Sequence, residues 1–517
     1  MQKKPTNILI ILDGWGVAPK NRGNAIELAK KPFFNNLVKK YPYTTLNATG
    51  LAVGLSENER SGSEAGHSNI GAGRIVKQDS QIIREDIESG VFFKNAEISK
   101  TMNHAIKAKK NLHLIGLFSE LDSPHSDPDH LFALLKIAKQ KKIKQVYLHL
   151  FTDGRDTYEK RALFFMKNLR EEIKKIGIGK IATIGGRYYG MDRVKHWSRL
   201  QRAYDAMVAG EGAKSKSAEE AIESAYNLGL TDEFIVPTVI VDENNKPIAR
   251  IKDNDAVIHF NIRGDRARQF TKLFVLDKID GYENRVNKLK DIYFCTLSDF
   301  GPDLPVQVAY SSQAVKNTLP SVLKDYRQLY IAEAEKYPHI TYFLNGGFKD
   351  PIGGEDREQI LSANVFSYDQ KPEMSAADIT KVVTSNIKYS VYDFMAVNYA
   401  NADMVGHTGN LKATISAIEC LDKCLTKVIE KILESGGAAI VTADHGNADE
   451  MVDLKTGETM TMHSKNPVPF ILVKKGLKKE KFQLKSNGVL GNVAPTMLDI
   501  MNVDKSKDMV LGSLIDK

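Results

Sequence analysis

The sequence predicts an α/β protein with two domains, one inserted into the other. Short apolar runs, rich in Val and Ile, alternate with helix-like stretches and often end at a polar cluster. This pattern is typical of buried parallel strands. The 517 residues exceed what one ordinary core accommodates. The polar clusters also differ in chemistry between the ends of the chain and its middle, which favours two domains of different roles.

The apolar runs predict the strands and, with them, the position of a site. Ligands of parallel α/β sheets bind beyond the carboxyl ends of the strands. The polar residues that follow each run are therefore the candidate site residues. The expected strands are Ile8–Leu12, Leu112–Phe118, Val146–Phe151, Ile181–Ile184, Val257–Phe260, Phe394–Val397 and Ala438–Val441.

The polar clusters also predict the domain boundaries. Asp, His and Ser clusters occupy the two ends of the chain, whereas arginines are concentrated in the middle. We therefore expect residues 1–79 and 311–517 to form one discontinuous, metal-binding domain. Residues 80–310 are expected to form an inserted, substrate-binding domain.

Composition and charge exclude several classes of protein. With 42% hydrophobic and 26% charged residues and a net charge of only +8, neither nucleic acid nor a membrane is expected as a partner. The apolar run near the start is too short for a signal peptide. Only three cysteines occur, which argues against a disulfide scaffold and favours the cytoplasm. Cys420 and Cys424 are expected to be core residues on one helix face.

Side chains at the two ends of the chain are candidate ligands of divalent metal ions. Oxygen and imidazole ligands without a thiolate suit Mn²⁺, Zn²⁺ or Mg²⁺, and paired ions can clamp both oxygens of a phosphoryl transfer. Each candidate alone has a structural alternative, such as a turn at Asp444 or a loop histidine at His463. The candidates are Asp13, Ser63, Asp403, His407, Asp444, His445 and His463.

Ser63 is also a candidate nucleophile. A serine that enters a helix presents its oxygen beside backbone amides and the positive end of the helix dipole. Coordination to a metal ion would activate the hydroxyl without a histidine base. The alternative is a helix N-cap, which the spacing alone favours.

Arginines at the ends of the middle strands predict an anionic substrate. Guanidinium groups bind carboxylate and phosphate in a bidentate manner. For any single arginine a surface salt bridge is the alternative, but the whole set favours a small anion with two charged ends. The set comprises Arg155, Arg187, Arg193, Arg263 and Arg266.

Strings along nearly the whole chain resemble one family, the cofactor-independent phosphoglycerate mutases of the alkaline phosphatase superfamily. They occur in the family's order, and the long strings are specific. The matching strings are Ile11–Gly16, Ser63–His67, Asn69–Arg74, Asp153–Asp156, Gly186–Tyr189, Met191–Arg193, Arg263 with Asp265–Arg266, Ala332–His339, Asn401–Gly409, Thr442–Asn447, and His463 with Asn466–Pro469.

The resemblance implies an alkaline-phosphatase-like metal domain and an isomerase that interconverts 3-phosphoglycerate and 2-phosphoglycerate through a phosphoserine on Ser63. It implies two divalent ions, which we expect to be Mn²⁺, with Mg²⁺, Zn²⁺ or Co²⁺ as alternatives. Lys336 would steady the phosphoryl group, Asp156 would handle protons, and the protein would be a monomer. One ion would be held by Asp403, His407 and His463, and the second by Asp13, Ser63, Asp444 and His445. The implied substrate-binding residues are His125, Arg155, Asp156, Arg187, Arg193, Arg263, Arg266 and Lys336.

Two departures from the family pattern stand out. The residues before the nucleophile are Ser61 and Gly62, where Gly-Asn is expected, so a donor to the phosphoryl group is missing. The loop before His125 is one residue longer than expected. Alternative functions are another phosphomutase or a metal-dependent phosphatase of the same superfamily, or a phosphate-ester binding protein that has lost catalysis.

Overall fold

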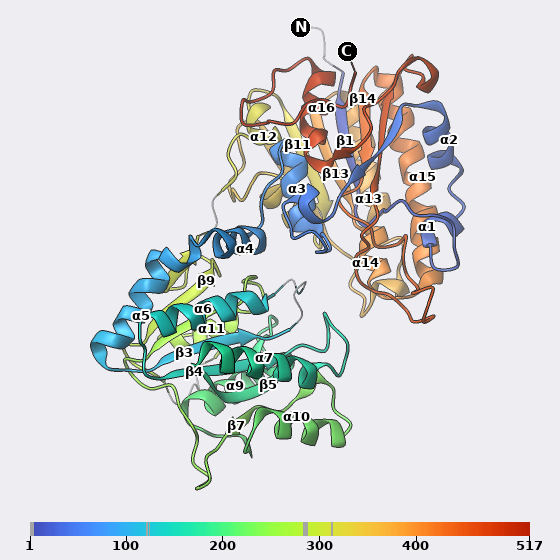
Figure 1. Cartoon of the computed structure of the whole chain (residues 1–517). Helices are drawn as coiled ribbons and strands as arrows, with labels where there is room; N and C mark the ends of the chain where they lie inside the picture. Colours follow the sequence, from blue (N-terminus) through green and yellow to red (C-terminus); the bar gives the residue numbers. More distant parts are fainter. Residues whose placement is uncertain (1–4, 120–122, 124, 283–287, 312–313, 517) are drawn as a thin grey trace. The chain divides into compact units, whose positions relative to one another are not determined.

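The computed structural model describes residues 5–119, 123, 125–282, 288–311 and 314–516. The chain divides into two compact units, each of which we describe by itself. Unit 1 comprises Met1–Gln78 and Gln313–Lys517, and unit 2 comprises Asp79–Ser312 (Figure 1). Unit 1 is thus built from both ends of the chain, and unit 2 from one continuous segment.

The described part of unit 1 contains an eight-stranded sheet in the order β12-β11-β13-β1-β14-β15-β2-β16. The neighbours from β12 to β14 pair in parallel, whereas β15 is antiparallel to both β14 and β2. The strands are β1 (Asn7–Leu12), β2 (Tyr43–Asn47), β11 (Gln328–Glu333), β12 (Glu355–Ile360), β13 (Phe394–Tyr399), β14 (Ala438–Thr442), β15 (Val468–Lys474) and β16 (Gly488–Val489).

Helices lie on both sides of this sheet (Figure 1). α15 is amphipathic, and its buried face includes Leu421, Cys424 and Leu425, as the apolar spacing predicts. Cys420 packs against the same core. The helices of unit 1 are α1 (Ala25–Leu28), α2 (Pro32–Lys40), α3 (Ser63–Ala72), α12 (Leu319–Val322), α13 (Ala376–Tyr389), α14 (Asn401–Gly406), α15 (Leu411–Ser435) and α16 (Val493–Met501).

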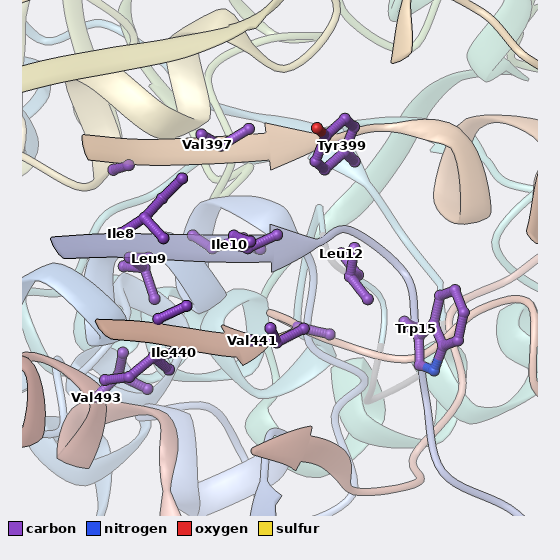
Figure 2. Packing of buried hydrophobic residues seen from close by; sticks show 14 of the residues in the cluster. Ile8, Leu9, Ile10, Leu12, Trp15, Val397, Tyr399, Ile440, Val441 and Val493 are labelled. Carbon is purple, nitrogen blue, oxygen red and sulfur yellow. The ribbon is translucent and has the colours of Figure 1, made fainter. Parts of the chain in front are cut away.

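The centre of the unit 1 core is strand β1. Its run from Ile8 to Leu12 is fully buried, because β1 lies between β13 and β14 and is covered on both faces. Figure 2 shows side chains of β1 packed beside Val397 of β13 and Val441 of β14. A strand buried on both faces reads as a continuous apolar run, which explains why the sequence predicts it.

The described part of unit 2 also contains an eight-stranded sheet, in the order β10-β9-β8-β3-β4-β5-β7-β6. Pairing is parallel from β10 to β5, and β7 is antiparallel to β5. The strands are β3 (Leu112–Leu117), β4 (Val146–Thr152), β5 (Lys180–Gly186), β6 (Ala213–Ser215), β7 (Thr238–Ile240), β8 (Ala256–His259), β9 (Tyr293–Ser298) and β10 (Gln307–Tyr310).

The helices of unit 2 alternate with its strands along the chain, as in other parallel α/β sheets. None of the described helices of either unit is long and apolar enough to cross a bilayer. The helices of unit 2 are α4 (Asp79–Ser89), α5 (Ala96–Ala108), α6 (Pro128–Gln140), α7 (Ala162–Ile176), α8 (Arg187–Gly190), α9 (Trp197–Val208), α10 (Ala218–Asn227) and α11 (Arg268–Val275).

The predicted α/β class is confirmed, and each of the expected apolar runs forms a strand. The predicted strands do not include β11 or β15, although both are almost wholly buried. Strand β15 runs antiparallel to its neighbours, so its carboxyl end points away from the edge where β1 and β14 end. No cluster of candidate residues therefore follows it.

Candidate active site

Three neighbouring parallel strands of unit 1 bring the candidate metal ligands to one edge of the sheet. In the pairing of β1, Leu12 lies opposite Tyr399 of β13, and Ile11 lies opposite Thr442 of β14. Asp13 directly follows β1, and Asp444 and His445 follow β14. Asp403 lies on α14, which begins two residues after β13. The carboxyl ends of parallel strands meet at one edge, so these side chains converge.

Glycine permits this convergence at one point. Gly14 has a φ of +77°, and a Cβ there would lie only 2.7 Å from Cα of Asp403. Any other residue would push the loop after β1 away from α14. Gly14 therefore allows α14 to approach the loop after β1 closely.

Ser63 is the first residue of α3, and its hydroxyl faces the carboxylates. The N-cap position belongs to Gly62, and the helix has no side-chain cap hydrogen bond. Ser63 Oγ lies 3.1 Å from Asp13 Oδ1 and 3.0 Å from His445 Nε2. The N-cap interpretation of Ser63, which the spacing favoured, is therefore wrong, because the backbone places the residue one position inside the helix.

Asp403, His407 and His463 form a compact group of three ligand atoms. Asp403 Oδ1 lies 3.2 Å from His407 Nε2 and 3.3 Å from His463 Nε2, and the two Nε2 atoms are 3.1 Å apart. Each Nδ1–H donates to a backbone carbonyl, that of Thr461 or Ser61, at 2.7 Å. In the neutral rings both Nε2 lone pairs then face inward, where they cannot bond to each other. Such backbone-oriented histidines are typical of metal ligands.

Asp13, Ser63, Asp444 and His445 form a second group. His445 Nε2 lies 3.5 Å from Asp13 Oδ1 and 3.6 Å from Asp444 Oδ2, and its Nδ1–H donates to the Gly446 carbonyl at 3.2 Å. Ligand atoms of Asp403, His445 and His463 also lie within 4.8 Å of one another. His445 Nε2 is nonetheless 4.0 Å from Asp403 Oδ1 but 3.0 Å from Ser63 Oγ, so we place His445 with Ser63.

Lys336 is the buried cation of this site. Its Nζ donates to Ser63 Oγ and Asp13 Oδ1, both at 2.7 Å, and to Asp403 Oδ2 at 2.5 Å. Burial alone would lower the pKa of Lys336, but the carboxylates of Asp13, Asp403 and Asp444 raise it above its ordinary value. The ammonium is therefore charged at neutral pH.

The donors fit divalent ions in kind and in charge. Burial would raise the pKa of Asp13, but Lys336 and His445 hold it well below its usual range. Burial likewise opposes ionisation of Asp403, and His407 and Lys336 outweigh it. Asp444 Oδ2 is buried without a hydrogen-bond partner among the described residues. Buried carboxylates with an unused oxygen call for further positive charge, and oxygen and imidazole donors suit Mn²⁺, Zn²⁺ or Mg²⁺.

The sequence-predicted substrate-binding residues of unit 2 follow four neighbouring strands. In the order β8-β3-β4-β5, His125 lies in the connection after β3, Arg155 and Asp156 follow β4, and Arg187 follows β5. Arg193 comes shortly after α8, and Arg263 and Arg266 follow β8. The same strand-end rule thus gathers these residues at one edge of the second sheet.

Positive charge in this group is only partly balanced. Arg187 is buried and pairs with Asp153 at 2.6 Å and with Asp156 at 2.5 Å. Burial, together with Arg187 and other arginines, lowers the pKa of Arg266 to about 10. Burial and the same positive charges hold the pKa of His125 well below its usual range, so this ring is neutral. Mutual repulsion among these clustered cations favours an anionic ligand.

Arg193 and Arg263 both lie near the same acidic residue, Asp265. Arg193 Nη1 lies 3.4 Å from Asp265 Oδ2, and Arg263 Nε lies 3.7 Å from Asp265 Oδ1. Their side chains are 56% and 39% exposed. The two guanidinium groups thus contact one carboxylate from positions about 70 residues apart in the chain.

Several residues in these clusters are missing from the sequence-predicted set, among them Asp153, His67 and Asn398. Asp153 accepts from Arg187, His67 lies 3.2 Å from Asp444 Oδ2, and Asn398 donates to Asp13 Oδ2 at 2.8 Å. Asp153 and His67 both lie inside strings that match the family, which was a usable signal. Asn398 lies inside the apolar run of β13, and nothing in the sequence marks it.

The two departures from the family pattern have different outcomes. A Cβ at Gly62 would lie 3.2 Å from Cε1 of His463, so a side chain at position 62 would require a small shift of this histidine. Of the longer loop before His125, residues 120–122 and 124 lie outside the described part. His125 itself is described and is 4% exposed.

Comparison with known proteins identifies the family to which the chain belongs. A model described as the metalloenzyme superfamily matches residues 6–505. The 2,3-bisphosphoglycerate-independent phosphoglycerate mutase of Clostridium kluyveri is 46% identical over 518 residues, covering 100% of both chains. The protein of the same name from Chloroflexus aurantiacus is 45% identical, with 98% of each chain covered.

Among solved structures, a Leishmania mexicana phosphoglycerate mutase determined at low cobalt concentration matches with a TM-score of 0.82 and 29% identity. The match covers 99% of this chain and 98% of that one. The sequence similarity and the fold similarity both extend over the whole length. The chain therefore belongs to the 2,3-bisphosphoglycerate-independent phosphoglycerate mutases, a family of the metalloenzyme superfamily.

Proposed function

We propose that this chain is an isomerase that interconverts 3-phosphoglycerate and 2-phosphoglycerate in glycolysis and gluconeogenesis, without added bisphosphoglycerate. The observation that carries the proposal is the environment of Ser63 Oγ. The oxygen lies 2.7 Å from Lys336 Nζ and 3.1 Å from Asp13 Oδ1. A hydroxyl that faces a buried ammonium and candidate metal ligands is suited to act as a nucleophile. Membership of the mutase family supports the substrate.

Ser63 takes the phosphoryl group from 3-phosphoglycerate to give a phosphoserine and glycerate. The glycerate then receives the group on its 2-oxygen. Two divalent ions, when bound, lower the pKa of the serine hydroxyl and neutralise charge on the phosphoryl oxygens. Lys336 donates to the serine oxygen and to the phosphoryl group. The proposed ligand sets are Asp403, His407 and His463 for one ion, and Asp13, Ser63, Asp444 and His445 for the other.

Unit 2 retains the glycerate between the two transfers. Its arginines bind the carboxylate and the phosphate through charge-assisted hydrogen bonds. Asp156 Oδ2 lies 3.6 Å from Nε2 of the neutral His125, which supports a role for Asp156 in moving the proton of a glycerate hydroxyl. The proposed substrate-binding residues of unit 2 are His125, Arg155, Asp156, Arg187, Arg193, Arg263 and Arg266. Lys336, a residue of unit 1, is proposed to bind the phosphoryl group of the substrate.

One assay distinguishes a mutase from the two alternative functions, a phosphatase and a binding protein. The arginine cluster argues against a simple phosphatase, which has no need to retain the dephosphorylated product. Purified protein with Mn²⁺ is incubated with 3-phosphoglycerate and no bisphosphoglycerate. We expect 2-phosphoglycerate to form with little free phosphate. Free phosphate alone would identify a phosphatase, and unchanged substrate would identify a binding protein.

We predict that chelation abolishes the activity and that Mn²⁺ restores it best among Mn²⁺, Mg²⁺, Zn²⁺ and Co²⁺. Activity should also fall at acid pH, because histidine nitrogens must be unprotonated to bind a metal. Elemental analysis of the chelated protein is the control for complete removal. Full activity of protein shown to be free of metal would contradict the proposal.

We also propose that the enzyme acts as a monomer in the cytoplasm. All proposed ligands come from one chain, so a second copy is not needed to complete either cluster. Light scattering during size-exclusion chromatography should give the mass of one chain at micromolar concentration. A stable dimer would contradict the proposal.

A further inference from the structure

His67 occupies a fully buried position next to the second ligand group. It lies on α3, four residues after Ser63, and its exposed fraction is 0%. Nδ1 is 2.9 Å from the Ser63 carbonyl oxygen and 3.2 Å from Asp444 Oδ2. Nε2 is 3.0 Å from Asn398 Nδ2 on β13. The proposed mechanism uses neither His67 nor Asn398.

The hydrogen-bond partners fix which nitrogen of His67 carries the proton. Asn398 Nδ2 lies 2.8 Å from Asp13 Oδ2, and a carboxylate only accepts hydrogen bonds, so the amide must turn its NH₂ group toward Asp13. The second hydrogen of this NH₂ group then points at His67 Nε2. Nε2 is therefore the acceptor, and Nδ1 is the donor to the Ser63 carbonyl.

This arrangement excludes a direct bond from His67 to a metal ion. Ligand atoms of Asp13, His67 and Asp444 lie within 4.8 Å of one another, which makes a metal triad conceivable. A histidine ligand needs a free lone pair on one nitrogen. The Nε2 lone pair accepts from Asn398, and Nδ1 carries a hydrogen that donates to Ser63. Neither nitrogen is free to bind an ion.

We propose that His67 and Asn398 are positioning residues that hold the Asp13 carboxylate in place relative to the backbone of Ser63 and pack His67 against the Asp444 carboxylate. The hydrogen bonds run from Asp13 through Asn398 and His67 to the Ser63 carbonyl, and all these side chains are buried. Nδ1 of His67 also lies 3.2 Å from Asp444 Oδ2, as a polar contact and not as a hydrogen bond. The hydrogen bonds link Asp13, a candidate ligand of one ion, to the backbone of the nucleophile. The inference rests on the proposed function, because it assumes that Asp13 and Asp444 bind metal.

The test measures Mn²⁺ binding to chelated protein by calorimetry and by the electron paramagnetic resonance signal of free Mn²⁺. Loss of a partner that orients a metal ligand typically weakens binding by about 10–100-fold. We expect His67→Ala and Asn398→Ala each to bind two ions, with one dissociation constant raised by roughly that factor. His67→Gln should lose less, because its side-chain oxygen can still accept from Asn398.

A double-mutant cycle separates this role from a general loss of stability. His67 and Asn398 are proposed to act through one series of hydrogen bonds. The double alanine variant should then lose about as much Mn²⁺ affinity as the single variant that binds Mn²⁺ less tightly, rather than the product of the two single losses. The matched control is His130→Ala, which removes a fully buried histidine of unit 2 whose ring nitrogens have no hydrogen-bond partner among the described residues. Its Mn²⁺ affinity should equal that of the wild type.

Three results would overturn the inference: wild-type affinity in folded His67→Ala, loss of one whole ion from that variant, or independent effects in the cycle. If His67→Ala does not fold, the Mn²⁺ dissociation constants of Asn398→Ala and His67→Gln test the inference in its place. Failure of the wild-type protein to bind Mn²⁺ would instead overturn the proposed function itself.

Discussion

Replacing Ser63 by alanine is expected to remove essentially all mutase turnover while the protein stays folded. The nucleophilic oxygen is lost, and no other described hydroxyl has the same contacts with Asp13, His445 and Lys336. The helix loses no cap, because the Ser63 side chain does not cap α3. Removing the hydroxyl should therefore change the free energy of unfolding by only about 1 kcal/mol. Turnover and the melting temperature are the measurements.

The matched control is Ser56→Ala. Ser56 is also buried, and its Oγ has no hydrogen-bond partner among the described residues. This variant should retain wild-type turnover. With labelled 3-phosphoglycerate, acid quenching should trap a phosphoserine at position 63 of the wild-type protein. Label on a histidine instead would show that the mechanism is wrong.

Asp403→Asn and Asp444→Asn are expected to abolish mutase activity and phosphate release together. Each replaces a candidate ligand with a neutral side chain of nearly the same shape, and both transfers need the ions. The effect should exceed that of any single arginine variant, because loss of an ion removes the activation of Ser63 and the neutralisation of the phosphoryl charge together. Mn²⁺ content and turnover of folded protein are the measurements.

Arg263→Ala and Arg266→Ala should behave differently from the two metal-ligand variants. Loss of one bidentate contact to an anion should cost roughly 1.5–3 kcal/mol of binding free energy. Substrate affinity and mutase turnover should fall, and more glycerate should escape before it is rephosphorylated. The informative ratio is free phosphate released per 2-phosphoglycerate formed. Wild-type partitioning and affinity in both arginine variants would contradict the role proposed for unit 2.

The sequence predicted the strands that carry Asp13 and Asp444 because a strand buried on both faces must be apolar throughout. It also predicted that side chains after such strands lie at one sheet edge. It did not predict that β1 lies between β13 and β14, since strand order depends on long-range packing. Asn398 shows the consequence. Its contact with Asp13 follows from the pairing of Ile11 with Asn398 across β1 and β13, which no local pattern encodes.

The N-cap interpretation of Ser63 failed for a related reason. Local spacing identifies a serine at the start of a helix, and N-caps are common there. Whether the residue occupies the cap or the first turn depends on the backbone one residue earlier. Gly62 takes the extended conformation with a φ of −148°. The close packing of His463 against Gly62 involves residues about 400 positions apart in the chain.

The central position of β1 also affects how the chain folds while it is being synthesised. Asn7 of β1 pairs with Phe394 of β13 and with Ala438 of β14, so the strand leaves the ribosome long before either neighbour exists. At ordinary translation rates this interval is on the order of tens of seconds. Unit 2 is continuous in sequence and is complete before β13 is made. A newly made apolar strand thus waits unpaired while another unit folds, and an unpaired apolar strand is prone to aggregate until β13 and β14 are made.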